Sequence, residues 1–304
     1  MPKSDMVITP GIILMVLTLA GIVKSQCDTT YTDVLTRVWG YYDVESSNNT
    51  LVVGAADSLS VLDELHGNTQ RDFVAIGVSN LLHTPGRKPI LVASVINGHK
   101  IIRFEQDASG TRATEMEMRT STEMQPTGSG GGEFEVYIVL KDNDDPPATQ
   151  NTSGLWNFSG NDNQDTHWPF TDGTVYESFG TITNGRVTVG NPSPSLSSAF
   201  RLYNVVADTN SHLVRLDTTV ISNPVKTYNP SFARACLGSS LNYTLRRFSG
   251  DIAFFRLYRP KLSQASRDSL QNYLSWKYDL AGFNPSNTGR AVSCTSGSPR
   301  RRLQ

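Results

Sequence analysis

The stretch FSGDIAFFRLYRPKLSQASRDSLQNYLSWKYDL, residues 248–280, joins the pattern of a buried strand to that of an amphipathic helix. Its first part, DIAFFRLY (251–258), is apolar on both faces of an extended chain, which predicts a strand covered on both sides. Strict alternation places Ala253, Phe255 and Leu257 on one face and Ile252, Phe254 and Tyr258 on the other. Phe254 then lies either between sheet and helix or in a contact surface.

The second part of this stretch has helical spacing. Apolar residues recur at steps of three and four, at Leu270, Tyr273, Leu274 and Tyr278. Ser263 is a suitable N-cap and Gly282 lies just past the end. The spacing predicts a helix over 263–280, and we expect it to lie across one edge of a sheet assembly.

Upstream, the chain is a series of short apolar runs separated by Gly, Pro, Asn and Asp, which is typical of strands. The runs are TLVVGA (50–55), FVAIGV (73–78), PILVASV (89–95), KIIRF (100–104), FEVYIVL (134–140), AFRLYNVVA (199–207), HLVRLD (212–217) and DIAFFRLY (251–258). Hairpin-type dipeptides lie between runs, at 97–98, 172–173 and 184–185. The pattern predicts an all-β sandwich of two antiparallel sheets with one C-terminal helix.

The ends of the chain have a different composition from its body. Residues 6–23 are uncharged and mostly apolar, which predicts that residues 1–25 are a signal peptide cleaved after Ser25, with a membrane anchor as the alternative. We expect one domain over 26–281 and a flexible basic tail over 282–304. The run PTGSGGG (126–132) fits a loop between strands as well as a linker. The protein is therefore expected to be secreted, at a cell surface or in a virion.

Charge and cysteine usage exclude several classes of function. A formal charge of -1 leaves no basic field for nucleic acid. Without a Cys-x-x-Cys pair, Cys27, Cys236 and Cys294 form neither a zinc knuckle nor a redox site. A disulfide from Cys27 to Cys294 and one from Cys236 to Cys294 are both open, and the oligomeric state is undetermined. Sequons at Asn48, Asn151, Asn157 and Asn242 permit glycosylation.

Several segments resemble the concanavalin A-like, laminin-G-like jelly-roll modules of bacterial surface proteins and of phage and large-virus structural proteins. They are VWGYYDVESSNNTL (38–51), RKPILVASVINGHKIIRFEQDASG (87–110), FEVYIVLK (134–141), YNVVADTNSHLVRLD (203–217) and the closing stretch 248–280. The resemblance implies a jelly-roll sandwich over nearly the whole mature chain. Phe254 stands where the family pattern often carries an acid.

The stretch THWPFTDGTVYESFG (166–180) and the preceding GLWNFSGNDNQD (154–165) combine aromatic rings with amides and carboxylates. Rings that stack on sugar C–H faces beside groups that bond hydroxyls suit a glycan site. The candidate ligand-binding residues are Trp156, Asn157, Asp162, Asp165, Trp168 and Tyr176. The alternative is that the aromatics pin a long loop, as similar runs do elsewhere in the family.

Two acidic segments of the sequence could supply ligands for a metal ion. Asp142, Asp144 and Asp145, with Asp162 and Asp165 in the later loop, offer oxygen ligands for calcium, but an acidic turn before two prolines is also an ordinary solvated turn. His167 is expected to be a hydrogen-bonded loop residue.

The acidic strand motif of retaining glucanases, a fold relative, is absent. Glu115 and Glu117 share a strand face with Arg119, which favours an exposed amphipathic stripe over an acid dyad. The sequence therefore predicts a non-catalytic module that recognises carbohydrate or a glycosylated partner. A structural component of a virion or cell coat is the alternative, and a glycan hydrolase or lyase is less favoured.

Overall fold

The computed structural model describes residues 38–42, 44–45, 50–51, 59–62, 73–75, 89–105, 116–118, 133–149, 153–158, 166–179, 186–208, 211–222, 236–239 and 247–281. The predicted signal peptide, the linker run 126–132, the dipeptide at 184–185, Gly282 and the basic tail lie outside these ranges, as do Cys27 and Cys294. Within these ranges, no helix is both long enough and apolar enough to cross a membrane.

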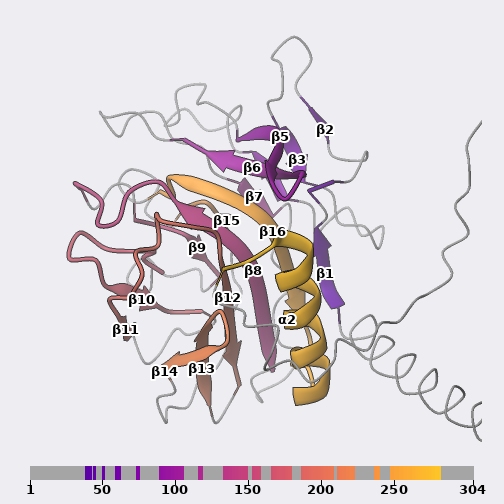
Figure 1. Ribbon diagram of the computed structural model, residues 1–304, viewed down its shortest axis with the longest axis vertical. Coiled ribbons are helices and arrows are strands. Elements are labelled where there is room, and N and C mark those ends of the chain that lie inside the picture. The colour runs from indigo at the N-terminus through magenta and orange to yellow at the C-terminus, as the bar shows by residue number, and fades with distance from the viewer. Residues whose placement is uncertain are drawn as a thin grey trace, which may run out of the picture.

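A large antiparallel sheet forms the centre of the molecule (Figure 1). Its eight strands follow the order β14-β13-β12-β8-β16-β6-β5, with β1 paired to β16 beside this path. The strands are β1 (Val38–Tyr42), β5 (Ile90–Ile96), β6 (His99–Phe104), β8 (Phe134–Asp142), β12 (Arg201–Ala207), β13 (His212–Leu216), β14 (Thr219–Ser222) and β16 (Gly250–Tyr258). The longest strands, β8 and β16, are neighbours and are buried almost along their whole length.

A second sheet and a hairpin pack on one face of the large sheet. The second sheet has the order β2-β3-β4-β7-β15-β9, and β10 pairs with β11 in the hairpin. The strands are β2 (Thr50–Leu51), β3 (Leu59–Leu62), β4 (Phe73–Ala75), β7 (Met116–Met118), β9 (Trp156–Asn157), β10 (Val175–Glu177), β11 (Val187–Gly190) and β15 (Cys236–Leu237). Every apolar run predicted as a strand contains one, and the all-β sandwich is confirmed.

The main core lies between the two sheets. The alternation of β8 sends Val136, Ile138 and Leu140 into this core, while Tyr137 and Val139 face the opposite side. Because both sets of side chains are 0% exposed, the large sheet is covered on both faces. The sequence pattern of the closing strand predicted this double covering, and the structure confirms it.

The closing strand β16 departs from strict alternation. Its register with β8 shifts between Ile252 and Phe254, so that Ala253 is the extra residue of a β-bulge. Ile252 therefore joins Phe255 in the inner core, whereas Ala253 and Phe254 both face outward. The predicted grouping of Ile252 with Phe254 was wrong, because a bulge reverses the order of faces beyond it. Phe254 is 4% exposed and lies between sheet and helix.

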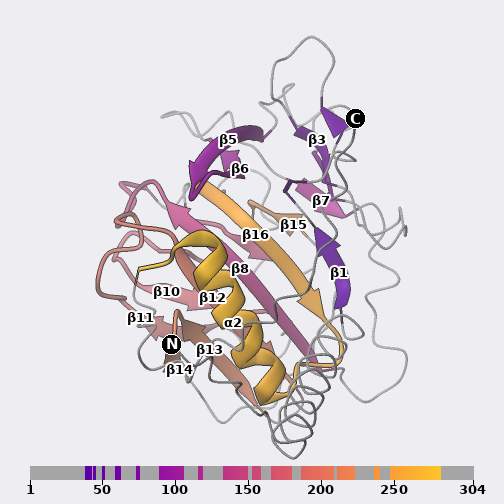
Figure 2. The ribbon, with the colours of Figure 1, turned by 45° about the vertical axis from the view of Figure 1, so that its right-hand side comes forward.

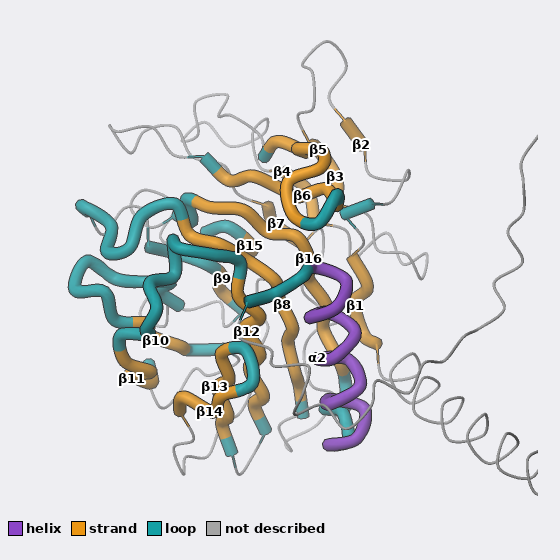
Figure 3. The backbone as a smooth tube through the Cα atoms, viewed as in Figure 1, coloured by secondary structure: helices purple, strands orange, loops and turns teal. Residues whose placement is uncertain are grey.

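The helix α2 (Gln264–Tyr278) covers the outer face of the large sheet. Ser263 caps it as predicted, since its side chain accepts a hydrogen bond from the backbone N–H of Ser266. The helix ends at Tyr278, before the predicted Gly282, and its C-cap Asp279 adopts the left-handed conformation. Figures 2 and 3 show that α2 lies over the sheet, with strands on both sides of it in projection.

The contacts of α2 correct its predicted position at an edge. Leu270, Leu274 and Tyr278 pack against outward residues of the central strands, among them Tyr137, Leu202 and Phe254. The Tyr278 hydroxyl also donates to the Ala253 carbonyl at 2.9 Å. The helix lies over the centre because the central strands, and not only an edge strand, carry apolar outer faces that must be buried.

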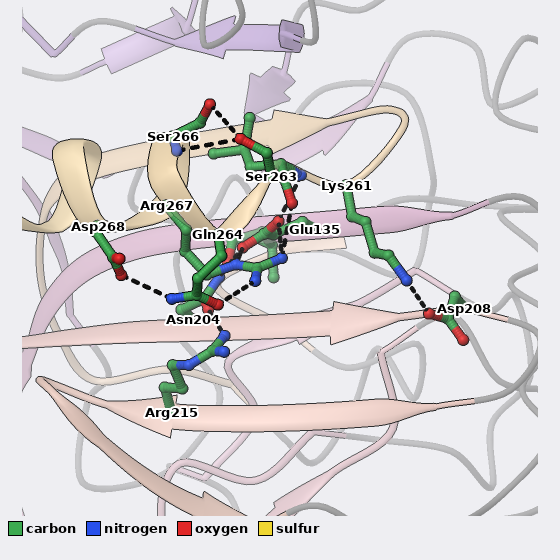
Figure 4. A network of polar contacts seen from close by, with 12 residues as sticks. Glu135, Asn204, Asp208, Arg215, Lys261, Ser263, Gln264, Ser266, Arg267 and Asp268 are labelled. Carbon is green, nitrogen blue, oxygen red and sulfur yellow. Dashed lines mark hydrogen bonds and ion pairs between the residues drawn. The ribbon is translucent and has the colours of Figure 1, made fainter. Parts of the chain in front are cut away.

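A buried ion pair joins α2 to the sheet (Figure 4). The Arg267 Nε donates to Glu135 Oε1 at 2.8 Å and its Nη2 donates to Oε2 at 3.1 Å, and Glu135 is fully buried. Asn204 Nδ2 and the Leu262 backbone N–H donate to the same carboxylate, at 3.0 and 2.8 Å. Glu135 thus binds the segment that enters the helix, the first turns of the helix and strand β12.

We predict that Arg267→Ala lowers the free energy of unfolding by about 3–5 kcal/mol, because it leaves the Glu135 carboxylate buried without its cation. Arg267→Lys should recover only part of this loss, since an ammonium does not reproduce the two-pronged contact. Urea unfolding monitored by circular dichroism measures both effects. Ser269→Ala, on the exposed side of the same helix, is the matched control. Equal unfolding midpoints for Arg267→Ala and Ser269→Ala would contradict the assigned role.

Candidate functional site

The two tryptophans of the predicted site lie inside the core. Trp156 and Trp168 are both 0% exposed. Trp156 stacks on Tyr203 with 5.8 Å between ring centroids, and the ring of Trp168 lies 4.2 Å from that of Tyr203. Neither indole presents a face to a ligand in this conformation. The burial of both tryptophans agrees with the alternative interpretation, in which aromatic residues hold the long loop against the core.

The polar partner of this aromatic cluster is the buried carboxylate of Glu177. Its Oε1 accepts hydrogen bonds from Trp156 Nε1 at 3.2 Å and Thr166 Oγ1 at 2.8 Å, and also from two backbone N–H groups, at 178 and 179. Its Oε2 accepts from the Tyr203 hydroxyl at 2.6 Å. Five donors therefore converge on one carboxylate that is 0% exposed.

Glu177 is a structural acid in this arrangement. Burial raises the pKa of its carboxyl above the ordinary value, against the opposing effect of the hydrogen bonds from Tyr203, Thr166 and Trp156. Both carboxylate oxygens are occupied by protein donors and closed to solvent, so the group is not placed to exchange a proton with a substrate. Its effect is to fasten β10 to β9 and β12.

The other predicted site residues do not form one cluster. Asn157 is 1% exposed on β9, which makes both a ligand contact and glycosylation of its sequon unavailable in this fold. Asp162 and Asp165 lie outside the described residues. Of the six predicted site residues, only Tyr176, at the centre of β10, is both among the described residues and partly exposed.

A tight turn brings an acid to Tyr176. The Phe170 carbonyl accepts from the Gly173 N–H at 2.8 Å, and the Phe170 N–H donates to the Thr174 carbonyl at 2.9 Å. Gly173 has a φ of 78°, and a Cβ at this position would lie 2.5 Å from the Asn191 side chain. The predicted Asp-Gly turn is thus confirmed, and it directs Asp172 back over the hairpin.

Three side chains contact Tyr176 at the surface, and together with it we call them the Tyr176 surface: Phe170, Asp172, Tyr176 and Arg186. The Tyr176 hydroxyl donates to Asp172 Oδ2 at 3.0 Å. The Arg186 guanidinium carbon lies 4.8 Å from the centre of the Tyr176 ring, and Phe170 meets the same ring edge-on at 5.9 Å. Asp172 and Arg186 are exposed, and both rings are partly exposed.

The electrostatics of this surface couple the acid to the phenol. The hydrogen bond to Asp172 raises the pKa of Tyr176 above its ordinary value. Burial acts to raise the pKa of Asp172, but hydrogen bonds from Thr174 and Tyr176 outweigh it and hold that pKa below its usual value. At neutral pH the surface therefore presents a carboxylate, a neutral phenol and a guanidinium around an aromatic ring.

His167 holds this surface from beneath. It is fully buried, its Nδ1 lies 2.9 Å from Ser153 Oγ, and its ring centroid is 4.9 Å from that of Phe170. Backbone hydrogen bonds connect His167 and Tyr176 in both directions, at 2.8 and 3.1 Å. The expectation of a hydrogen-bonded loop histidine is confirmed.

The acidic turn weighed for calcium has structural contacts. Asp145 Oδ2 accepts from the Leu196 N–H at 2.6 Å and from Ser195 Oγ at 2.8 Å, which ties the turn to a neighbouring loop. Asp142 is 1% exposed, and its Oδ1 accepts from the Asp144 N–H at 2.7 Å. Among the described residues, no group of three or more His, Cys, Asp or Glu side chains could hold a metal ion. Calcium binding by the whole chain stays open.

The acid pair weighed for catalysis lies at the edge of what the structure describes. Glu117 is in β7, where its backbone pairs with Val74 and Cys236, and the adjacent Met116 is fully buried. Glu115 and the side chain of Glu117 lie outside the described positions. The predicted strand at this place is confirmed, and the roles of its acids stay predictions.

A depression of about 500 Å³ lies on β5 and β6, with Lys100, Arg103 and Glu105 around apolar residues of β5. Arg103 is held in a two-pronged ion pair with Asp251, at 2.7 and 2.9 Å. No aromatic side chain is among its described lining residues. For a ligand that needs a stacking ring, this depression is a poorer fit than the Tyr176 surface.

One exposed aromatic residue escaped the sequence-based selection. Trp276 is 77% exposed, and Tyr273, predicted to belong to the buried stripe of the helix, is 47% exposed. At 100° per residue, Trp276 lies on the opposite side of α2 from Leu270 and Leu274. This position away from the apolar stripe was the feature of the sequence that could have indicated an exposed tryptophan.

Neither protein-family models nor curated proteins match the sequence. Solved structures do match its fold. A glycoside hydrolase family 54 α-L-arabinofuranosidase is similar at a TM-score of 0.50 and 11% identity, over 74% of this chain and 52% of the enzyme chain. The chain thus spans about half the length of that arabinofuranosidase. At such identity the similarity shows the fold alone.

Two further similar structures were determined with sugars. Domain 4 of AbnA, an extracellular arabinanase of family 43 from Geobacillus stearothermophilus, was solved with arabinotriose; it shares 13% identity at a TM-score of 0.44, over 76% of this chain and 97% of that domain. The family 40 carbohydrate-binding module of a Ruminococcus gnavus sialidase, solved with α2,3-sialyllactose, shares 17% identity at a TM-score of 0.35, over 47% of this chain and 83% of that module.

We predict that Glu177→Ala lowers the free energy of unfolding by at least about 3 kcal/mol, because it leaves several buried donors without an acceptor. Glu177→Gln should cost much less. Its amide oxygen can replace Oε1, and its NH₂ can donate to the Tyr203 hydroxyl oxygen. Urea unfolding midpoints of the two variants test this, and similar losses for both would show that the donors do not depend on Glu177.

A second prediction concerns the buried Asp142. Burial raises the pKa of this carboxyl well above its ordinary value, and its Oδ2 has no hydrogen-bond partner among the described residues. Because folding raises this pKa, Asp142 contributes stability below the ordinary pKa of a carboxyl. That contribution is lost as the pH rises through the pKa of Asp142 in the folded state. Asp142→Asn should therefore gain stability over the parent as the pH rises from about 4 to 8. Parallel urea-midpoint curves against pH would contradict this.

Proposed function

We propose that this chain is a non-catalytic carbohydrate-binding module and that the Tyr176 surface contacts the sugar. The proposal rests on one observation: Tyr176 is a partly exposed ring held between a carboxylate at 3.0 Å and a guanidinium at 4.8 Å. A sugar offers an apolar C–H face for the ring and hydroxyls that both donate and accept. Asp172 supplies acceptors and Arg186 supplies donors.

The rigidity of the surface supports binding at low entropic cost. Tyr176 lies between two buried strand neighbours, Val175 and Glu177, and Glu177 is fastened by its five donors. The Asp172 turn is closed by backbone hydrogen bonds. A site that is ordered before the ligand arrives loses less conformational entropy on binding.

The absence of catalysis is part of the proposal. The most deeply buried carboxylates, Glu135 and Glu177, are occupied by structural hydrogen bonds and closed to solvent. Asp172 and Tyr176 offer one carboxylate and one phenol, whereas glycoside hydrolysis usually needs two carboxyl groups flanking the bond. Recognition without turnover is the function that these groups support.

The wider setting follows from the sequence. We propose that the module works outside the cytosol, after passage through the secretory route by residues 1–25, and that its sandwich is of the concanavalin A-like, laminin-G-like kind. A glycan, or a glycan on a partner protein, is then the ligand class. The sugars present in the similar structures, arabinotriose and sialyllactose, are suitable first probes.

We predict that Tyr176→Ala weakens binding to the best glycan of an array at least about fivefold, the loss of roughly 1 kcal/mol of aromatic contact. Tyr176→Phe, which keeps the ring and removes the bond to Asp172, should fall between the parent and Tyr176→Ala. Binding is measured by glycan array followed by isothermal titration calorimetry with the selected oligosaccharide.

Ser269→Ala, at an exposed position on α2, is the control for a surface substitution on the opposite side of the large sheet from Tyr176. The melting temperature of each variant, measured alongside, separates loss of the site from loss of the fold. A folded Tyr176→Ala protein that binds glycan as tightly as the parent would refute the assignment of this surface. A parent that binds no glycan at all would refute carbohydrate recognition and leave a packing role in a coat as the function to test.

A further inference from the structure

A second aromatic surface lies on the outward side of α2. The centroids of the Trp276 and Tyr273 rings are 6.3 Å apart, with 41° between their planes, on successive turns of the helix. Trp276 is 77% and Tyr273 is 47% exposed. Asn272 and Asp279 lie on the same outward side at helical spacing. We call Asn272, Tyr273, Trp276 and Asp279 the Trp276 platform.

The helix beneath the platform is held rigidly at both ends. At its start, Arg267 is locked into Glu135. At its end, the Asn97 side-chain amide donates to the Lys277 carbonyl at 2.8 Å, and the Tyr278 hydroxyl donates to the Ala253 carbonyl. Trp276 lies one residue before Lys277 and therefore projects from a fixed backbone. A backbone held in this way needs no reordering when a ligand contacts the ring.

The charged side chains that the structure describes on the outward side of α2 are acidic. Asp268 and Asp279 are exposed on α2, while the Lys277 ammonium lies 5.0 Å from the Tyr278 ring, a residue of the buried side. An acidic surround opposes an anionic ligand and an anionic lipid surface. It is compatible with an uncharged ligand whose hydroxyls donate to carboxylate and amide oxygens.

The size of the platform argues against a stable dimer built on it. A specific protein interface buries about 800 Å² on each partner, which is several times what two partly exposed rings can supply. Two adjacent rings with polar neighbours match instead the apolar face and hydroxyl rim of one or two sugar units.

We propose that the Trp276 platform is a second carbohydrate-contact surface, specific for uncharged glycans, with Trp276 as its main stacking residue. This inference rests on the proposed function, because it adds a second contact to a carbohydrate-binding module. The two surfaces belong to different layers: α2 covers the outer face of the large sheet, whereas β10 packs through Val175 into the core between the sheets. A long or densely displayed polymer that engages both gains apparent affinity by multivalency.

The experiment uses affinity electrophoresis of the full chain through gels that contain neutral polysaccharides, namely arabinan, xylan, galactan and β-glucan. Polygalacturonate is the anionic comparison. Trp276→Ala should reduce retardation by the best neutral polymer at least fivefold, and Trp276→Phe should restore most of it. Ser269→Ala, on the same outward side of α2, should leave retardation unchanged. Ligand titration should also change tryptophan fluorescence less in Trp276→Ala than in the parent, because Trp276 is exposed whereas Trp156 and Trp168 are buried.

Each result bears on one of the two proposals. Retardation that falls for Trp276→Ala and independently for Tyr176→Ala supports both surfaces. If it falls only for Tyr176→Ala, the platform is refuted and the proposed function stands. If it falls only for Trp276→Ala, the platform stands and the Tyr176 surface is refuted. A parent that no polymer retards refutes both. Stronger retardation by polygalacturonate, or a dimer in sedimentation that Trp276→Ala abolishes, overturns the platform as a site for uncharged glycans.

Discussion

The large sheet is apolar on both faces, and the rest of the structure follows from the need to cover it twice. On one side the second sheet and the β10–β11 hairpin enclose the inner residues of β8, β12 and β16. On the other side α2 covers their outer residues. Each cover has an outward side of its own, and Tyr176 and Trp276, two of the accessible aromatic residues that the structure describes, lie on these two sides.

Two buried carboxylates determine where each cover attaches. Glu135 binds α2 through Arg267, and Glu177 binds the hairpin through Trp156, Thr166 and Tyr203. A buried carboxylate is costly unless its partners are in place, so each acid disfavours arrangements in which its cover has slipped. Apolar contacts provide most of the burial energy, whereas these polar contacts select one geometry. The positions of the surface residues therefore depend on acids that are themselves closed to solvent.

Local chemistry was enough to predict the helix, most of the longer strands and several of their ends. Ser263 caps α2 because a hydroxyl before a helix satisfies its first N–H groups, and Asn97 and Gly98 turn the β5–β6 hairpin because both adopt positive φ. The bulge at Ala253 could not be predicted, since it depends on the register between β16 and β8. Trp156 and Trp168 were assigned to a ligand site because composition alone does not distinguish a surface ring from a core ring.

The sequence by itself determined the class of fold, because period-two and helical spacing are local properties that survive in any arrangement of the chain. It also determined that β16 is covered on both sides, since apolar residues occupy both faces. Only the tertiary structure decided which aromatic residues meet solvent. The burial of a ring depends on residues distant in sequence, as when Tyr203 packs against Trp168. It also depends on where α2 packs, which is over the centre of the large sheet.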